Sequence, residues 1–181
     1  YGVSENELTQ AASLIKLPVM SLVYKKAEDG QLDLEAKAPG SSSTYKELVT
    51  AMGKRSDNAA FTTLVKYFGE VAIQKYIDEI GLTKSSIGKN KTTPVDIGVF
   101  FEKLWNKEIV TESSRDAILN ALTDTIYEDW LVAGIPDVRI AHKFGREIHV
   151  VNDAGIIFGK QPFILVIMTQ GVVEKEADAI I

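Results

Sequence analysis

The chain has 181 residues, of which 45% are hydrophobic and 25% are charged, proportions that suit a globular protein with a sizeable core. Its net charge of −5 argues against a nucleic-acid-binding surface, because such a surface needs a basic stripe. The absence of cysteine excludes disulfides and thiol chemistry, and no apolar stretch reaches the length of a membrane span.

Periodic apolar residues predict helices over most of the first two thirds of the chain. The expected helices are residues 9–27, 44–52, 56–69, 70–82, 92–106 and 111–124. Pro18 removes a backbone donor inside the first of them, so we expect a bend there. Asp57 or Asn58 is expected to cap the third helix, and Gly69 to end it.

The last third of the chain changes to strand-like patterns. Residues 138–144 alternate in character, and residues 147–159 are strand-like around an expected turn or bulge at Asn152–Gly155. Residues 162–171 form a continuous apolar run, which predicts a central strand buried on both faces. The short connections predict an antiparallel meander. Residues 174–181 are typical of the start of a final helix.

This order of elements predicts an α+β fold, in which an antiparallel sheet is flanked by helices and joined to a mostly helical lobe. We expect one domain over residues 1–181. Residues 1–40 and 135–181 would form the sheet-containing lobe, and residues 41–134 the helical lobe. Ligand sites favour the seam between two such lobes.

The stretch "AASLIKLPV" places a serine three residues before a lysine in an apolar helix. Residues at this spacing share one helix face, so Lys16 could act as a base for a nucleophilic Ser13 if burial lowers its pKa. A helix cap and a solvent-exposed lysine would give the same pattern. The spacing recurs at Ser43–Lys46 and Ser86–Lys89 in loop or boundary positions, so the pattern alone decides nothing.

Two further motifs follow along the chain. In "KRSDNAAF", Ser56 and Asn58 can point the same way from a loop–helix junction, while Asp57 faces back and braces the loop; a simple cap is the alternative. In "AHKFGRE", Lys143 stands at the end of a strand, and Gly145 would let a ligand approach the backbone closely. An exposed lysine beside a turn glycine is the alternative there.

Taken in this order, the three motifs resemble the S-x-x-K, S-D-N and K-T-G signature of class A β-lactamases and related penicillin-binding proteins. Longer segments are also similar to that superfamily, so the resemblance covers nearly the whole chain. Among them are "YKELVTAMGKRSDNAAFTTLVKYFG", "TTPVDIGVFFEKLW" and "NDAGIIFG".

The resemblance implies an exported serine hydrolase that needs neither a metal nor another cofactor. Ser13 would be the nucleophile that forms an acyl-enzyme with β-lactams or peptidoglycan-like peptides. Lys16 would be its general base, with a pKa lowered partly by Lys143. Ser56 would relay a proton to the leaving nitrogen, and Asn58 would hold the substrate's side-chain amide.

The resemblance also implies how the substrate is bound. Its oxyanion would lie between the backbone N–H groups of Ser13 and Arg146, and its carboxylate would be attracted by Lys143. The third motif departs from the family here, because Phe144 replaces the hydroxyl residue that contacts the carboxylate. Arg146 could supply a charged substitute.

A second departure concerns release of the acyl group. Class A enzymes carry a glutamate that activates the deacylating water, but "GLTKSSIGKNKTT", residues 81–93, contains no acidic residue. Slow hydrolysis of the acyl-enzyme is therefore expected, unless the fold brings Glu128, Asp129 or Glu147 near Ser13. The alternatives are a D-alanyl-D-alanine peptidase or transpeptidase-like protein that β-lactams trap, and a non-catalytic binding relative of the same fold.

A third departure lies at the ends of the sequence. The family's first helix and two strands are expected to be absent, which leaves a three-stranded sheet with an unpaired apolar edge. A partner chain or missing terminal segments would cover that edge. The chain shows no signal peptide at its first residues, and we expect no nucleic-acid partner.

Overall fold

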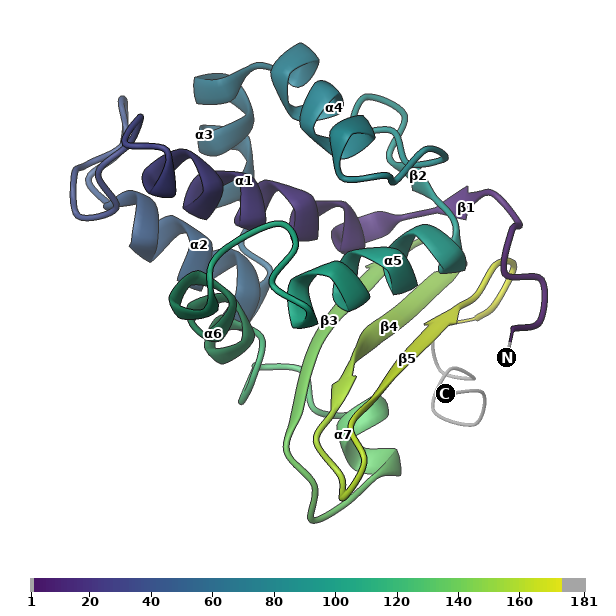
Figure 1. Ribbon diagram of the computed structural model, residues 1–181. Coiled ribbons are helices and arrows are strands. Elements are labelled where there is room, and N and C mark those ends of the chain that lie inside the picture. The colour runs from purple at the N-terminus through teal and green to yellow at the C-terminus, as the bar shows by residue number, and fades with distance from the viewer. Residues whose placement is uncertain (1, 174–181) are drawn as a thin grey trace.

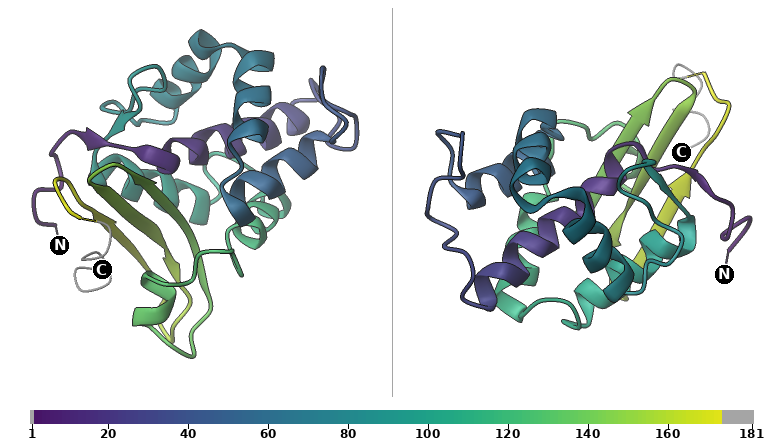
Figure 2. Two further views of the ribbon diagram at one scale, coloured as in Figure 1. Left: turned by 180° about the vertical axis from the view of Figure 1, so that it is seen from behind. Right: turned by 90° about the horizontal axis from the view of Figure 1, so that it is seen from above.

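The structure is a computed structural model that describes residues 2–173 of the chain. Figures 1 and 2 show helices gathered around one central helix, with a small antiparallel sheet to one side. The elements in chain order are β1 (Thr9–Gln10), η1 (Ala12–Ile15), α1 (Lys16–Glu28), α2 (Tyr45–Arg55), α3 (Asn58–Phe68), α4 (Glu70–Glu79), β2 (Lys91–Thr92), α5 (Pro94–Trp105), α6 (Glu112–Ala121), α7 (Leu131–Gly134), β3 (Ile140–Glu147), β4 (Val150–Ile157) and β5 (Phe163–Met168).

Helix α1 is the central helix, and its first nine residues are buried on every side. All nine residues from Lys16 to Tyr24 are buried, as expected for a helix that packs against neighbours all round. Helices α2, α3, α4 and α6 contact it along its length (Figures 1 and 2). Lys16, at its first turn, is therefore held within the hydrophobic core.

The start of the expected helix over residues 9–27 is wrong. Strand β1 pairs antiparallel with β2, η1 is a short 3₁₀-helix, and α1 begins only at Lys16. Pro18 thus lies in the first turn of α1, where the missing N–H costs the helix little. The helical period changes from the 3₁₀-helix η1 to the α-helix α1 just before Pro18.

The other helices begin and end at residues that suit those positions, among them Asp57 and Gly69, which the sequence predicts. Thr44 caps α2 in a capping box with Glu47, Asp57 caps α3 by accepting from the Ala60 N–H, and Thr93 caps α5, which starts with Pro94. Gly69 ends α3. The helices predicted over residues 44–52, 56–69, 70–82, 92–106 and 111–124 are confirmed to within a few residues.

The three late strands form an antiparallel meander in the order β3–β4–β5, as predicted. Two details differ from expectation. Strand β4 runs unbroken through Asn152–Gly155, and the turn lies before it, at Ile148–His149. Gly155 is needed for close strand approach instead, because a Cβ there would lie 2.3 Å from the Ala141 carbonyl oxygen. Strand β4 is the central strand, and β5 is an edge strand of the described sheet.

Successive side chains of β3 point to opposite faces of the sheet. Lys143 and Gly145 face η1, together with Asn152 of β4, whose Nδ2 donates to the carbonyl oxygens of Gln10 and Ala11 at 2.9 and 3.3 Å. Phe144 lies on the opposite face, in a small cluster with Trp130 and Val151. The face of the sheet that carries Lys143 is therefore fixed to the segment that carries Ser13.

The observed architecture is the α+β fold that the sequence predicts, with helices around a small antiparallel sheet. The division into two lobes stays a prediction. The final helix expected over residues 174–181 lies outside the described residues. Within residues 2–173, no helix is both long and apolar enough to cross a membrane.

Candidate active site

The side-chain nitrogen of Lys16 connects the first motif, which contains Ser13, with the second, which contains Ser56 and Asn58. Its Nζ lies 3.0 Å from Ser13 Oγ, 3.1 Å from Ser56 Oγ, 2.6 Å from the Ser56 carbonyl oxygen and 2.6 Å from Asn58 Oδ1. Its side chain is buried. The residues that would act together under the sequence hypothesis are therefore in direct contact, although up to 42 positions separate them along the chain.

Ser13 lies in η1, immediately before the buried helix α1. Its neighbours Ala12 and Leu14 are buried, whereas Ser13 itself is partly exposed. Ala12 has a positive φ of 48°, an unfavourable conformation for a residue with a Cβ. Such strain persists only where the surroundings hold it, and here β3, β4 and the N–H-to-carbonyl bond from Ala11 to Asn90 hold the segment.

The Ser56–Asp57–Asn58 turn joins α2 to α3. Ser56 adopts the left-handed conformation, with φ 54° and ψ 37°, which directs both its carbonyl oxygen and its hydroxyl to Lys16. Asp57 accepts from the Ala60 N–H at 2.8 Å, a bond that lowers the pKa of its carboxyl group. Asp57 also pairs with Arg55 at 3.5 Å, so its carboxylate contacts both sides of the turn.

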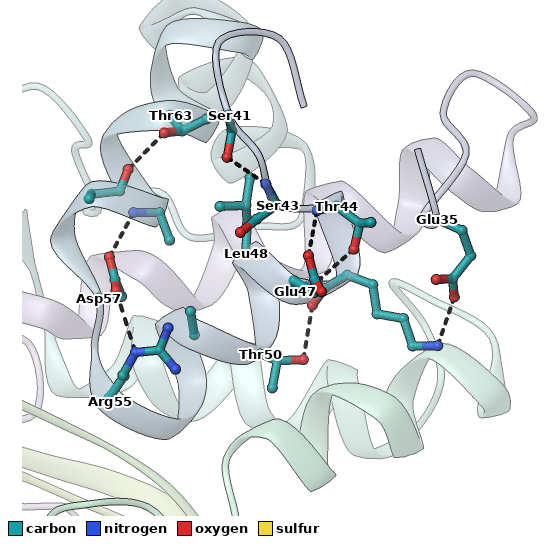
Figure 3. Close-up of a pocket in the computed structure, with 14 residues that line it drawn as sticks. Glu35, Ser41, Ser43, Thr44, Glu47, Leu48, Thr50, Arg55, Asp57 and Thr63 are labelled. Carbon is teal, nitrogen blue, oxygen red and sulfur yellow. Dashed lines mark hydrogen bonds and ion pairs between the residues drawn. The ribbon is translucent and has the colours of Figure 1, made fainter. Parts of the chain in front are cut away.

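Asp57 also lines a groove of about 680 Å³, shown in Figure 3. The picture shows Asp57 directed at Arg55 and at the backbone of α3. The groove is lined by hydroxyl and charged side chains of α2, α3 and the loop before them, but not by Ser13 or Lys16. The groove is therefore separate from the Lys16 cluster, and the turn forms a wall between them.

Lys143 completes the cluster from β3. Its Nζ donates to Ser56 Oγ at 2.9 Å and to the Phe144 carbonyl oxygen at 2.8 Å, and it lies 3.9 Å from the centroid of the Phe144 ring. The side chain has no exposed surface. The Ser56 hydroxyl therefore lies between two lysine amines, one from each side.

Burial controls the charge of both lysines. It lowers the pKa of Lys16 from 10.5 to about 8, while the nearby Asp57 carboxylate opposes the change. The pKa of Lys143 falls well below its usual value, first because of burial and then because of the Lys16 charge. The sequence hypothesis assigned the lowered pKa of Lys16 partly to Lys143. In the structure the identified causes are burial for Lys16 and, for Lys143, burial followed by Lys16.

This arrangement suits a neutral lysine amine acting as a base. A neutral amine has two N–H groups and one lone pair. The two shortest contacts of Lys16, at 2.6 Å, go to oxygen atoms that can only accept. If both N–H groups are used there, the lone pair is left for a hydroxyl proton, and Ser13 Oγ lies 3.0 Å away. The geometry meets the distance requirement for general base catalysis.

Gly145 makes room for the backbone of the segment that carries Ser13, whereas its expected closeness to a ligand stays a prediction. A Cβ at this position would lie 2.8 Å from the backbone nitrogen of Ser13 and 3.2 Å from that of Leu14. The close approach that glycine permits here is therefore that of the Ser13 backbone. Arg146 follows with an exposed side chain, and its guanidinium lies 5.4 Å from the centroid of the Tyr127 ring.

Glu128, Asp129 and Glu147 are the three candidate carboxylates for deacylation. Two of them, Glu128 and Glu147, bind side chains other than Ser13 and Lys16. Glu128 accepts from Thr125 and lies 3.6 Å from His142 Nε2. Glu147 accepts from Gln10 and Asn90, both at 3.2 Å. Asp129 is exposed. Within residues 2–173, no carboxylate has a hydrogen bond to Ser13 or Lys16.

The two other serine–lysine pairs have surface positions. Lys46 forms an exposed ion pair with Glu35 at 2.8 Å and lines the groove of Figure 3. Ser86 lies in the loop before β2, where its Oγ accepts from the Lys89 N–H. Neither lysine is buried, so only Ser13–Lys16 has the environment that the chemistry needs.

The sequence did not indicate two contacts near the site. Tyr127 packs on Phe144 with ring centroids 3.9 Å apart, and no sequence signal in the loop around residue 127 indicates this contact. His142 Nδ1 lies 2.8 Å from Asp153 Oδ1, and both residues are buried. The alternation of β3 and β4 could have placed these two side chains on one face, once the register was known.

Comparisons with known proteins agree with this geometry. The sequence model of the beta-lactamase enzyme family (Beta-lactamase2) matches residues 1–181. A structure of PBP-A is similar with a TM-score of 0.89 and 24% identity, covering 96% of this chain and 78% of that one. A related PBP-A variant was solved as an acyl-enzyme complex with penicillin G, with a TM-score of 0.84, 25% identity, and coverage of 93% and 75%.

A β-lactamase from Sphaerobacter thermophilus has a TM-score of 0.92 and 22% identity, covering 99% of this chain and 81% of that one. No curated protein matches. The solved structures show the same fold, and the family model extends over every motif described above. The chain therefore belongs to the beta-lactamase enzyme family, within the superfamily of β-lactamases and penicillin-binding serine hydrolases.

Proposed function

We propose that the protein is an active-site serine hydrolase whose Ser13 is acylated by β-lactams or related amides. The observation that carries this proposal is the placement of Lys16 Nζ 3.0 Å from Ser13 Oγ, with its remaining contacts made to Ser56 and Asn58. The penicillin G complex of the PBP-A variant supports a β-lactam as the acyl donor.

Acylation begins with attack of Ser13 Oγ on the amide carbonyl carbon, as the Ser13 proton passes to the neutral Lys16 amine. The carbonyl oxygen becomes an oxyanion, which the backbone N–H groups of Ser13 and Arg146 stabilise. When the carbon–nitrogen bond breaks, a proton passes from Lys16 through the Ser56 hydroxyl to the leaving nitrogen. Ser56 Oγ is 3.1 Å from Lys16 Nζ, which suits this relay.

We propose that release of the acyl group is slow. Hydrolysis needs a base that activates water on the acyl-enzyme, and the loop 81–93 supplies no carboxylate. Glu128 and Glu147 are engaged with other side chains. A long-lived adduct would also be the behaviour of a peptidase that β-lactams trap, so the lifetime of the adduct decides between the two enzymatic alternatives.

Incubation with penicillin G tests the proposal directly, with intact mass and β-lactam hydrolysis followed together. We expect one added penicillin per chain, a slow return to the free mass, and no adduct with Ser13→Ala. Ser43→Ala, which alters a surface serine at the same spacing from a lysine, is the control and should react like the wild type. Absence of any adduct and of any turnover would contradict the proposal.

The acylation rate is expected to depend on pH through Lys16. Only the neutral amine accepts the Ser13 proton, and the pKa of Lys16 is about 8. The rate should therefore rise roughly tenfold per pH unit below that value and level off above it. Rapid-quench mass spectrometry between pH 6 and pH 10 measures this dependence. A flat profile over that range would contradict the role of Lys16 as base.

We further propose that the protein is exported, since its proposed substrates lie outside the cytoplasm and members of its family are generally exported. Peptidoglycan-like peptides are the proposed natural acyl donors. We also keep the proposal that a partner chain or further residues cover the outer edge of β5, where apolar side chains are only partly buried.

A further inference from the structure

A further cavity, of about 470 Å³, lies at the end of α1 that is remote from Lys16. Its volume is within the range of about 300–1,000 Å³ that is usual for small-molecule sites. Side chains of α1, α3, α4, α5 and the loop after α5 line it. One of them, Lys25, lies about 14 Å from Lys16 along the helix axis. The cavity is therefore separate from the candidate active site.

Part of the cavity lining is apolar. Leu22, Ile80 and Ile109 are buried side chains that face it, Phe68 is partly buried, and Ala72 is exposed beside them. These residues come from four different segments of the chain, so the apolar surface exists only in the folded protein. An apolar chain that covered this surface would remove both surfaces from water, which favours binding.

Charged side chains line the rest of the cavity, and positive charge is in excess there although the whole chain has a net charge of −5. Two ion pairs neutralise part of this charge, with 2.5 Å between Lys25 and Asp29 and 3.4 Å between Lys75 and Glu79. The charged residues of the lining are Lys25, Lys26, Lys75, Lys103, Asp29, Glu79 and Glu108.

Lys103 of α5 is the lysine that lacks a partner. Within residues 2–173 its amine has neither a hydrogen bond nor an ion pair, whereas Lys26 donates to Gln31 at 2.9 Å. The Lys103 side chain is only partly exposed, and a Cβ at Gly81 would lie 3.3 Å from its Nζ. A partly buried ammonium that has lost hydration without gaining a partner favours an anion beside it.

We propose that this cavity binds an amphipathic monoanion, which is a molecule with one carboxylate and an unbranched apolar chain. The chain lies on the apolar surface between α1 and α4, and the carboxylate pairs with the Lys103 ammonium. One negative charge fits better than two, because Glu108 also lines the cavity and would repel a second one. The site is independent of the proposed acylation of Ser13.

Decanoate below its micelle concentration is the probe, with decan-1-ol and decylammonium as neutral and cationic molecules of the same chain length. Methyl NMR signals of Ile80 and Ile109 report binding, since both side chains line the cavity. We expect decanoate to shift both signals and to bind about tenfold more tightly than decan-1-ol, with decylammonium the weakest.

Lys103→Met should lower the affinity for decanoate about tenfold and leave that for decan-1-ol unchanged, which removes the preference for the anion. Lys66→Met, at an exposed lysine of α3 outside the cavity, is the matched control and should bind as the wild type does. Ala72→Phe should weaken both ligands, because the added ring fills the apolar part of the cavity. This second variant preserves the test if Lys103→Met fails to fold.

Several results would overturn the inference. Equal affinities for decanoate and decan-1-ol would show that no cation recognises the carboxylate. Lys103→Met could instead lower the melting temperature without changing affinity, in which case the amine only stabilises the end of α4. Binding to phosphatidylglycerol vesicles, with no effect of decanoate on the two methyl signals, would place a lipid surface there instead of a single molecule.

Ser13→Ala separates this inference from the proposed function, because it removes the nucleophile and leaves the cavity unchanged. We expect this variant to bind decanoate with the wild-type affinity. Loss of decanoate binding in a folded Ser13→Ala protein would overturn the inference, since the ligand would then occupy the Ser13 site. Failure of penicillin G to form an adduct would contradict the proposed function alone.

Discussion

Lys16→Met is expected to reduce the acylation rate of Ser13 by a factor of about 10² to 10⁴, the usual contribution of a general base. Methionine keeps an unbranched chain in the buried first turn of α1 but has no amine to accept the Ser13 proton. The hydrogen bonds to Ser56 and Asn58 would be lost as well. Intact mass after incubation with penicillin G measures the loss.

The chain offers a matched control for this variant in Lys46→Met. Lys46 follows Ser43 at the same spacing, but it forms an exposed ion pair with Glu35, a contact that contributes little to stability. Its replacement should leave the acylation rate unchanged. A Lys16→Met protein that melts cooperatively and still reacts at the wild-type rate would show that another group removes the Ser13 proton.

Gly145→Ala is expected to reduce acylation by about 10² or more, because a displacement of about 1 Å at a reacting group has an effect of this size. The new Cβ would lie 2.8 Å from the Ser13 nitrogen, closer than two such atoms approach without strain. Since β3 and η1 are both buried, the Ser13 backbone must move, and the N–H that would bind the oxyanion moves with it.

Gly98→Ala serves as the control, because a Cβ at this position of α5 meets no atom within 4 Å. Alanine is favoured over glycine inside a helix by about 0.5–1 kcal/mol, so this variant should unfold at a slightly higher temperature and react normally. Thermal unfolding and acylation rates are measured for both variants. Wild-type acylation by a folded Gly145→Ala protein would show that η1 adjusts without loss of the site.

The sequence predicted most helices and the motif residues because the signals for them are local. The capping residues Thr44, Asp57 and Thr93 satisfy backbone groups within their own helices, so their roles do not depend on the rest of the fold. The short connections between the late strands likewise predicted the meander. The three motifs in this order, together with longer similar segments such as "NDAGIIFG", carried the resemblance that predicted the family.

Strand order could not be predicted in the same way. Residues 162–171 are more continuously apolar than 147–159, yet β4 is central and β5 is an edge strand. A continuous apolar run indicates only that both faces of a strand are buried against other elements. Which edges are paired depends on neighbouring strands, and Gly155, interpreted as a turn signal, allows β3 to lie close to β4.

The sequence by itself therefore predicted the fold class from its order of helices and strands, and the family and the candidate nucleophile from its resemblance to known sequences. Only the tertiary structure decided that Lys16 is buried with a pKa of about 8, that Gly145 makes room for the Ser13 backbone, and that Phe144 covers Lys143. The physical reason is that burial and contact depend on segments far apart in the chain, and these meet only when the sheet packs against η1 and α1.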